Sequence, residues 1–317
     1  MTPPYDITSK IITLLASVSE KIGAANALYL NRQSPQLRKQ NQIKTIHSSL
    51  QIEGNTLSEA QITAIIENKN VAGPEKDIKE VLNAISVYDL LDTFKAFSEK
   101  DFLKAHKQLM DGLIEQPGRY RKQGVGIMKG KQVAHIAPPA ENVPYQMKDL
   151  FSYLKTSEEP ALIKSCVFHY EMEFIHPFMD GNGRMGRLWQ TVVLMEQHPV
   201  FASLPFETLI SKHQSDYYNA LALSDKIGKS TPFIEYMLGI IDASLGTLLN
   251  YNDRTMTVVQ RLEYFVSTRK SSFTRKDYMD TFKDISSATA SRDLKKGVSS
   301  GLFTITGSGN QTRYQIP

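Results

Sequence analysis

The sequence is poor in cysteine and has no long apolar run. Its 317 residues include a single cysteine, Cys166, which excludes an intramolecular disulfide and a multi-cysteine zinc site. We expect Cys166 to be a small buried side chain. No stretch of 18 consecutive apolar residues occurs, and positions 1–6 lack a basic segment that leads into an apolar one, so we expect neither a membrane span nor a signal peptide. These absences predict a cytosolic protein.

The composition is ordinary, but the charge is unevenly distributed. Hydrophobic residues make up 41% and charged residues 22%, which is typical of a soluble globular protein of one large or two moderate domains. From position 251 onward there are eleven basic and six acidic residues, a net charge of +5, so the rest of the chain carries −1 of the total of +4. A basic terminal segment is the pattern expected of a nucleic-acid binder.

The most informative stretch is 175–187, which reads IHPFMDGNGRMGR. Pro177 disfavours the helical conformation for the residue before it, so an incoming helix should end at His176. Gly181 and Gly183 permit a tight turn and close approach of a ligand to the backbone. The next helix, expected from Arg184 to about Gln197, would direct its free N–H groups toward that turn. The stretch therefore predicts an anion-binding loop.

The charged residues of this stretch favour phosphate chemistry. Arg184 and Arg187 share one helix face near an N-terminus, where cations are disfavoured unless an anion such as a polyphosphate is bound. Asp180 offers a hard oxygen ligand, as Mg²⁺ commonly uses together with substrate phosphates. His176, with an ordinary pKa of about 6.5, could act as a general base. The alternative is a capped helix in which the glycines only form a turn and the polar residues are caps.

This stretch resembles the signature of the Fic family, His-Pro-Phe-x-Asp/Glu-Gly-Asn-Gly-Arg-x-x-Arg, at every specified position. The resemblance implies transfer of AMP from ATP to a hydroxyl side chain of a target protein, with release of pyrophosphate. It implies that His176 is the base and Asp180 the Mg²⁺ ligand. It further assigns the anion hole and the distal phosphates to Gly181, Asn182, Gly183, Arg184 and Arg187.

A second motif lies upstream, at 49–54, which reads SLQIEG. By itself Glu53 is a solvated acid at the end of a helix that Gly54 terminates. The segment matches the family's inhibitory pattern, Ser/Thr-x-x-x-Glu-Gly/Asn, which begins here at Ser49. The resemblance implies an ion pair between Glu53 and Arg187 that occupies the guanidinium needed by the γ-phosphate, because an arginine fork accepts carboxylate or phosphate equally well.

Other candidate contacts come from weaker patterns. Alternating apolar residues on both sides of 129–131 predict a short hairpin, either a plain surface hairpin or, by resemblance, the family's flap over the nucleotide. The flap contacts would then be Gln132, Val133, Ala134 and His135. The resemblance also places Tyr217, Tyr218 and Asp225 at the nucleotide. We expect His106 to be a packed core residue and Ser58 to cap a helix together with Gln61.

The predicted fold is mainly α, in three parts. Residues 1–95 form an N-terminal helical region with the inhibitory helix, 96–250 a Fic-type helical core with a small β-hairpin flap, and 251–317 a winged-helix domain of three helices and two strands. Residues 250–253 are expected to be a linker. DNA could meet the third helix of the tail, through Thr289, Ser291, Arg292, Lys295 and Lys296, although winged helices also dock proteins.

Several functions remain open at this stage. The chain could transfer another phosphate-containing group, or remove AMP hydrolytically with Glu53 orienting the water. It could also be a transcriptional regulator whose core only senses a nucleotide. The expected partners are ATP, Mg²⁺ and a target protein that presents a hydroxyl, with no membrane. A homodimer is a further candidate, because family members often self-associate.

Overall fold

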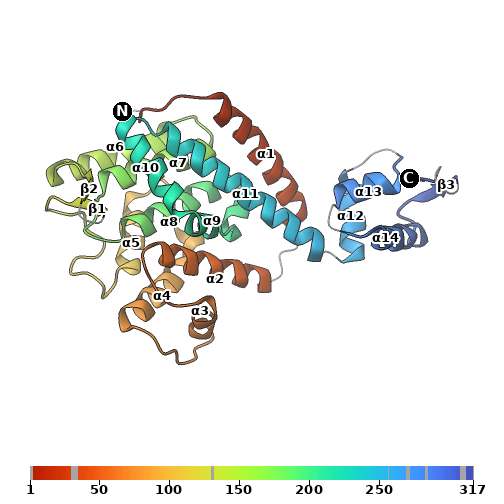
Figure 1. Cartoon of the computed structure of the whole chain (residues 1–317), viewed down its shortest axis with the longest axis horizontal. Coiled ribbons are helices and arrows are strands. Elements are labelled where there is room, and N and C mark those ends of the chain that lie inside the picture. The colour runs from red at the N-terminus through yellow and green to blue at the C-terminus, as the bar shows by residue number, and fades with distance from the viewer. Residues whose placement is uncertain are drawn as a thin grey trace. The chain divides into compact units, whose positions relative to one another are not determined.

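The computed structural model describes residues 3–29, 35–129, 132–255, 257–268, 272–282, 285–307 and 312–316. It divides into two compact units, one of Met1–Ile22 with Gln33–Ser244 and the other of Gly23–Arg32 with Leu245–Pro317. Figure 1 shows the elements of both.

Helices make up most of the chain, which confirms the predicted mainly α class. The α-helices of the first unit, with the two that continue into the second, are α1 (Ser9–Tyr29), α2 (Pro35–Ile52), α3 (Glu59–Ile66), α4 (Glu75–Tyr88), α5 (Glu99–Leu109), α6 (Val143–Thr156), α7 (Ala161–Ile175), α8 (Asn182–Met195), α9 (Glu207–Lys212), α10 (Gln214–Ile227) and α11 (Thr231–Thr255). Short 3₁₀ helices lie at Leu91–Thr93, Ala140–Asn142 and Pro199–Ser203.

The core of the first unit is built around α7 and α8. Residues 161–170 of α7 are all buried, as expected of a helix covered on every side. Trp189 of α8 is fully buried, packs edge-on against Phe102 of α5 and donates its indole N–H to the carbonyl of Ala96 over 3.0 Å. Because α7 ends and α8 begins at the loop 176–181, this packing fixes both ends of that loop.

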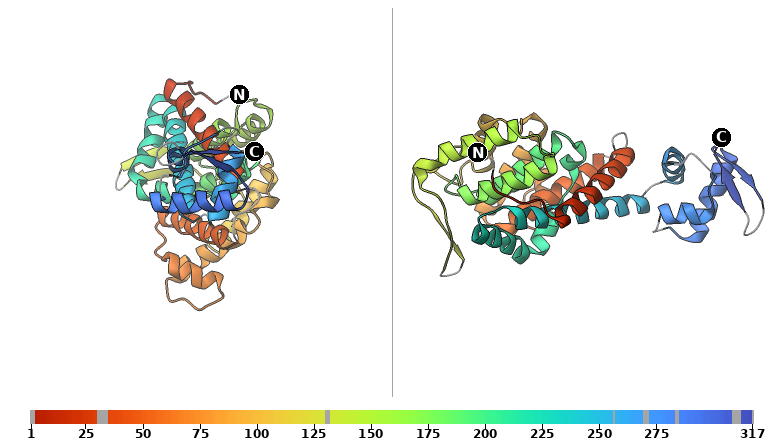
Figure 2. Two further views of the ribbon diagram at one scale, coloured as in Figure 1. Left: turned by 90° about the vertical axis from the view of Figure 1, so that its right-hand side faces the viewer. Right: turned by 90° about the horizontal axis from the view of Figure 1, so that it is seen from above.

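A single hairpin interrupts the helices of the first unit in the part that the structure describes. Strands β1 (Gly126–Lys129) and β2 (Gln132–Ile136) pair antiparallel, with a register shift between Ile127 and Met128. Figure 2 shows the hairpin extending outward from the helices. The predicted hairpin is therefore confirmed, although its turn residues 130–131 lie outside the described part.

The structure confirms two of the local features predicted near helix ends and contradicts a third. The capping box of Ser58 with Gln61 is present at α3, and Gly54 has a φ of 92° just after α2 ends. The predicted linker at 250–253 is wrong, because α11 runs on to Thr255. Asn and Asp are weak helix formers, and without glycine or proline they did not stop a helix that was already established.

One helix needs comment because of its apolar character. Residues Thr231–Asn250 of α11 are long and apolar enough to cross a membrane, with a mean hydropathy of 1.3. Half of that stretch is buried within the protein, and Phe233, Met237 and Leu245 are fully covered. The core helix of a soluble protein passes the same test of length and composition, so the stretch is only weak evidence for a membrane span.

The second unit follows the predicted order of three helices and two strands. Its elements are α12 (Val258–Thr268), α13 (Arg275–Thr281), α14 (Ser287–Ser299), β3 (Thr304–Thr306) and β4 (Arg313–Gln315). The strands pair antiparallel, and the helices enclose an aromatic core that includes Phe265, Phe273 and Phe303. A buried ion pair joins Arg261 to Asp293 over 2.6 Å. The assignment of this unit as a winged helix stays a prediction.

Candidate active site

The loop between α7 and α8 begins with a left-handed residue. His176 has φ 50° and ψ 60°, a conformation that is uncommon for a residue other than glycine. It follows the last turn of α7, where its amide donates to the carbonyl of Met172 over 2.9 Å. Pro177 disfavours continuation of the helix, as predicted, and the αL turn leaves the half-buried imidazole at the mouth of the loop.

A buried arginine fixes the start of the loop. Arg121 is 3% exposed and donates from its guanidinium to backbone carbonyls of Gln123, Pro138, Ile175 and His176, the last over 2.7 Å. Its own amide donates to the carbonyl of Pro177 over 2.9 Å. The backbone around the imidazole is thus held by charge-assisted hydrogen bonds, which are stronger than neutral ones.

A histidine and a phenylalanine support the middle of the loop. The buried rings of His106 and Phe178 stack with 3.5 Å between their centroids. Burial lowers the pKa of His106 to about 4, so the ring is neutral near pH 7. Its Nδ1 must then accept from the amide of Gly118 over 2.8 Å, which leaves Nε2–H to donate to the carbonyl of Asp180 over 3.0 Å. The predicted core position of His106 is confirmed.

The turn into α8 is closed by an asparagine. The Asn182 amide accepts from the Phe178 N–H over 2.9 Å and donates to the Phe178 carbonyl over 3.0 Å, so its side chain braces the loop. Gly181 is the N-cap residue with φ 84°, and a side chain there would collide with the Met110 sulfur. The first amides of α8 lack intrahelical acceptors, and together with the helix dipole they favour an anion at this end.

Arg184 is tied to two carboxylates. It is 4% exposed, and it donates to Glu80 over 3.0 Å and to Asp180 over 3.1 Å. Glu80 is also buried and accepts from Asn55 over 2.9 Å. The ion pair with Glu80 therefore fixes the direction of the Arg184 guanidinium beneath the loop.

Glu53 occupies the end of α8 that favours an anion. Its carboxylate accepts from Arg187 over 2.7 Å, and a Cβ built at Gly183 would overlap it. Arg187 is 1% exposed and also donates to the carbonyl of Ser49 over 2.9 Å and to the Ser49 hydroxyl over 3.2 Å. The carboxylate thus stands where a ligand anion would meet both the helix terminus and the guanidinium.

Electrostatics favour this arrangement. Burial alone would lower the pKa of the Arg187 guanidinium, but Glu53, Tyr217 and Glu173 raise it above its ordinary value. Arg187 therefore remains charged although it is almost fully buried. A buried cation of this kind requires an anionic partner at short range, so an anion that displaced Glu53 would have to take over the same contact.

Asp180 fits the role of a metal ligand only in company with a substrate. Its side chain is half exposed, and one oxygen accepts from the Gly181 amide over 2.6 Å and from Arg184. The other oxygen accepts no hydrogen bond within the described residues. No cluster of three or more His, Cys, Asp or Glu side chains suited to a metal occurs in that part of the chain. A lone open carboxylate suits Mg²⁺, which takes its other ligands from phosphates and water.

The remaining residues predicted to contact the nucleotide differ in burial and in their hydrogen-bond partners. Tyr217 is buried, with its hydroxyl 3.0 Å from Nε2 of His169. Tyr218 is 39% exposed, and its hydroxyl accepts from Gln214, which also donates to the carbonyl of Ile52, the residue before Glu53. Asp225 accepts from the Tyr170 hydroxyl over 3.0 Å. The side chains of Gln132, Val133, Ala134 and His135 lie outside the described part.

Two residues of the site were not found by sequence reasoning. Arg121 and Glu80 lie far from the loop along the chain, and each is buried in a hydrogen-bonded contact with it or with Arg184. Glu80 does carry a signal, since a carboxylate stands beside Val81, Ala84 and Val87 on the apolar face of its helix. Nothing in the sequence distinguishes Arg121 from its exposed neighbour Arg119.

Curated relatives match the larger part of this chain. Protein adenylyltransferase Fic of Drosophila mojavensis is 27% identical over 272 residues, which are 80% of this chain and 50% of that protein. Protein adenylyltransferase fic-1 of Caenorhabditis elegans is 27% identical over 236 residues, 67% of this chain and 44% of that protein. The chain thus spans about half the length of the curated relatives it matches.

Comparison with family models and solved structures identifies the family. The Fic/DOC family model matches residues 96–194. A Fic family protein from Desulfovibrio desulfuricans G20, known from its crystal structure, is 39% identical with a TM-score of 0.77, over 100% of this chain and 98% of that one. The signature at 176–187, the helical fold and this likeness agree, and the chain belongs to the Fic family.

Proposed function

We propose that this chain is an autoinhibited protein adenylyltransferase that moves AMP from ATP to a hydroxyl side chain of a target protein. One observation carries the proposal. The carboxylate of Glu53, directly after α2, pairs with Arg187 in the N-terminal half of α8, and His176 begins the short loop that leads into that helix. An anion site and a base stand together, and the anion site is occupied by the protein's own side chain.

The reaction follows from these residues. The turn at Gly181–Gly183 and Arg184 bind and orient the polyphosphate, and Arg187 receives its γ-phosphate once Glu53 withdraws. The target hydroxyl gives its proton to His176 while its oxygen forms a bond to the α-phosphorus. The bond from that phosphorus to pyrophosphate breaks, and the arginines stabilise the charge on the leaving group. Mg²⁺, held by Asp180 and the phosphates, would supply further charge neutralisation.

The inhibited state is supported by how α2 docks. Ser211 donates to the Gln51 side chain over 2.7 Å, and Gln214 donates to the Ile52 carbonyl over 2.7 Å. These contacts hold the end of α2 against α9 and α10. With Glu53 in place, a triphosphate would meet a carboxylate at Arg187, and the two anions would compete for one guanidinium.

The test uses ATP labelled at either the α- or the γ-phosphate, incubated with Mg²⁺, a protein lysate and each variant. Glu53→Gly is expected to transfer the α-label but not the γ-label to protein, at a rate well above that of the wild type. Adding His176→Ala to it should reduce transfer by about 10²- to 10⁴-fold. Equal labelling in all variants would contradict the proposal. Transfer of the γ-label, or release of AMP from a modified target, would favour another phosphate-group transfer or AMP removal.

A second activity is proposed for the C-terminal unit, which would bind duplex DNA through α14. Arg292, Lys295 and Lys296 are all exposed on this helix, and Arg275 donates to Ser291 beside them. Exposed cations on one helix face suit phosphate contacts. Because these cations could bind DNA, a transcriptional regulator whose core only senses a nucleotide remains the alternative to the enzyme.

Salt-dependent binding of the whole chain to duplex DNA tests this activity. Replacing Arg292, Lys295 and Lys296 with alanine should reduce the slope of log affinity against log salt by about 2 to 3. The matched control replaces Lys95, Lys100 and Lys107, which are exposed on the first unit, and should leave the slope unchanged. An unchanged slope in the α14 variant, or no binding at low salt, would remove the idea and favour a protein-docking role.

A further inference from the structure

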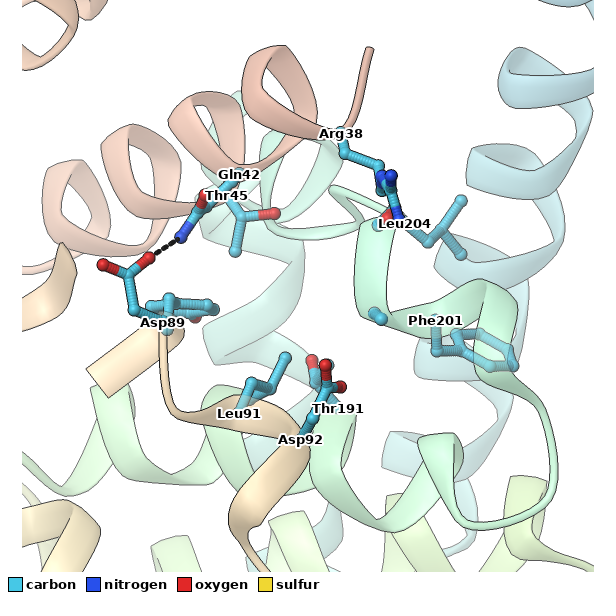
Figure 3. Close-up of a pocket in the computed structure, with 12 residues that line it drawn as sticks. Arg38, Gln42, Thr45, Asp89, Leu91, Asp92, Thr191, Phe201 and Leu204 are labelled. Carbon is cyan, nitrogen blue, oxygen red and sulfur yellow. Dashed lines mark hydrogen bonds between the residues drawn. The ribbon is translucent and has the colours of Figure 1, made fainter. Parts of the chain in front are cut away.

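A polar cavity of about 250 Å³ lies against α2, outside the loop site. It is bounded by α2, by the turn after α4, by α8 and by the 3₁₀ helix that precedes α9 (Figure 3). At about 30 Å³ for each water, it has room for roughly eight waters, or for a small organic ligand.

Unmatched charges of opposite sign face this cavity. Figure 3 shows Arg38 on one side and Asp92 and Asp89 on others. Within the described residues, neither Arg38 nor Asp92 forms an ion pair or a hydrogen bond, whereas Asp89 accepts from Gln42 over 2.9 Å. A purely anionic ligand would meet the two aspartates, and a purely cationic one would meet Arg38. The lining therefore suits a zwitterion.

The rest of the lining suits a compact apolar body. Leu91, Phe201 and Leu204 are buried and line the cavity between the charged groups. An α-amino acid combines a carboxylate and an ammonium group with a side chain of this size. Its carboxylate would pair with Arg38 as a charge-assisted hydrogen bond, and its ammonium with Asp92.

Three helices connect the cavity to the catalytic loop. α8 contributes Thr191 to the cavity and, one turn before it, Arg187, whose carbonyl accepts from the Thr191 hydroxyl over 3.3 Å. α4 contributes Tyr88 to the cavity and Glu80 to Arg184. Tyr88 also borders a small void that Ser49 and Arg184 line. The cavity and the loop site are therefore lined by neighbouring turns of the same packed helices.

The third helix is the inhibitory one. The cavity residues Arg38, Gln42 and Thr45 follow a spacing of four and three, and Ser49, which touches Arg187, continues the same face. From Arg38 to Glu53 the rise is about 22 Å at 1.5 Å per residue. A ligand that bridges Arg38 and the core therefore fixes one end of the element whose other end carries Glu53.

We propose that this cavity binds a small zwitterionic amino acid, and that its occupancy strengthens inhibition by holding α2 in place. The sign follows from linkage, because the site is formed by α2 and the core together and exists only while α2 is docked. A ligand that binds the docked state alone must favour that state. The regulatory part rests on the proposed function; the binding site itself does not.

Binding is tested on the whole chain with the twenty standard amino acids, each at about 10 mM, by thermal shift and then by titration calorimetry. At least one should raise Tm, while its methyl ester and its N-acetyl form should not. Arg38→Ala and Asp92→Asn should each weaken binding by about tenfold or more. Both residues are exposed, so the variants should fold. The matched controls Lys39→Ala and Asp149→Asn, also exposed, should bind as the wild type does.

Three outcomes would overturn the binding site: no amino acid binds, the ester or N-acetyl form binds equally well, or the Arg38 and Asp92 variants bind unchanged. The regulatory part is read separately, as transfer of α-label from ATP. The bound amino acid should lower transfer by the wild type and leave Glu53→Gly unaffected, and a rise or no change in the wild type would overturn the coupling. If no variant transfers AMP, the proposed function fails while the binding result stands.

Discussion

The loop between α7 and α8 and the segment that carries Glu53 meet at the same helix terminus but are held very differently. The loop is fixed by Arg121, His106 and Asn182, all buried and all bonded to its backbone. The carboxylate of Glu53 is 29% exposed, and within the described residues it accepts one hydrogen bond, from Arg187.

This difference indicates which part can move. A loop held through its own carbonyls cannot leave without unfolding locally, since each broken contact leaves a buried polar group unpaired. The partly exposed Glu53 carboxylate can rotate into water at a smaller cost, because Glu173 still stabilises the Arg187 cation that it leaves behind. The site is therefore preorganised, and the proposed inhibition depends on a contact that an anion can replace.

The largest expected effect comes from releasing the loop. Arg121→Ala removes the four guanidinium bonds to backbone carbonyls. We expect the free energy of unfolding to fall by about 3 to 5 kcal/mol, and AMP transfer to be lost even when Glu53 is glycine. Chemical denaturation measures the first and labelled ATP the second. Arg119→Ala, two positions earlier in the chain and exposed, is the control. A loss below about 1 kcal/mol for Arg121→Ala would refute a fixed loop.

The second effect is a pH dependence that belongs to the loop. Burial lowers the pKa of His106 to about 4, below the ordinary value near 6.5, so between these values the native state binds fewer protons than the unfolded chain. The contribution of neutral His106 to the free energy of unfolding is complete above about pH 6.5. It falls by about 3 kcal/mol as the pH approaches 4. Chemical denaturation of the wild type and of His106→Gln from pH 7 to 4 should show that the difference between their free energies of unfolding becomes smaller as the pH falls. Parallel curves would contradict the assignment.

A smaller change in stability should accompany a large change in activity at Glu53. Glu53→Gln keeps the shape of the side chain but removes its charge. The amide oxygen of glutamine can still accept from Arg187, and the carboxylate of Glu173 still stabilises the buried cation. We therefore expect the free energy of unfolding to fall by only about 1 kcal/mol, while AMP transfer rises well above wild type. Glu59→Gln, exposed at the start of α3, should change neither. A loss of stability as large as that of Arg121→Ala would end the contrast between the two regions.

The smallest effect concerns Ser49. Its hydroxyl accepts from Nε of Arg187 over 3.2 Å, while its carbonyl keeps a second bond to the same guanidinium. Ser49→Ala should therefore cost less than about 1 kcal/mol and activate AMP transfer less than Glu53→Gln does. Ser48→Ala, whose hydroxyl bonds to Thr208 instead, serves as the matched control. Activation equal to that of the Glu53 variant would assign the inhibition to Ser49 as well.

Much of the loop could be predicted because its determinants are local. Pro177 ended α7 at His176, and both arginines lie in the N-terminal half of α8 as expected. The helix begins at Asn182, two residues before the predicted start at Arg184, so that Gly183 lies within it. Arg121 could not be predicted, because its partners are 54 and 55 positions away along the chain.

The same limit applies to the other contacts. His106 was expected in the core, and it is there, but its bond to the Asp180 carbonyl depends on tertiary packing. The ion pair of Glu53 with Arg187 spans 134 positions and was anticipated only through resemblance to a family. The prediction of a linker at 250–253 was wrong for the opposite reason. It relied on weak local signals, and these did not end α11, which continues to Thr255.

The central claim is that Glu53 occupies the place of a nucleotide's terminal phosphate at Arg187. A crystal structure of Glu53→Gly with Mg²⁺ and a non-hydrolysable ATP analogue tests it most directly. The account predicts the γ-phosphate bonded to the Arg187 guanidinium over the turn at Gly181–Gly183, with the α-phosphorus facing His176. A triphosphate bound elsewhere, or an empty turn beside an unpaired Arg187, would contradict it.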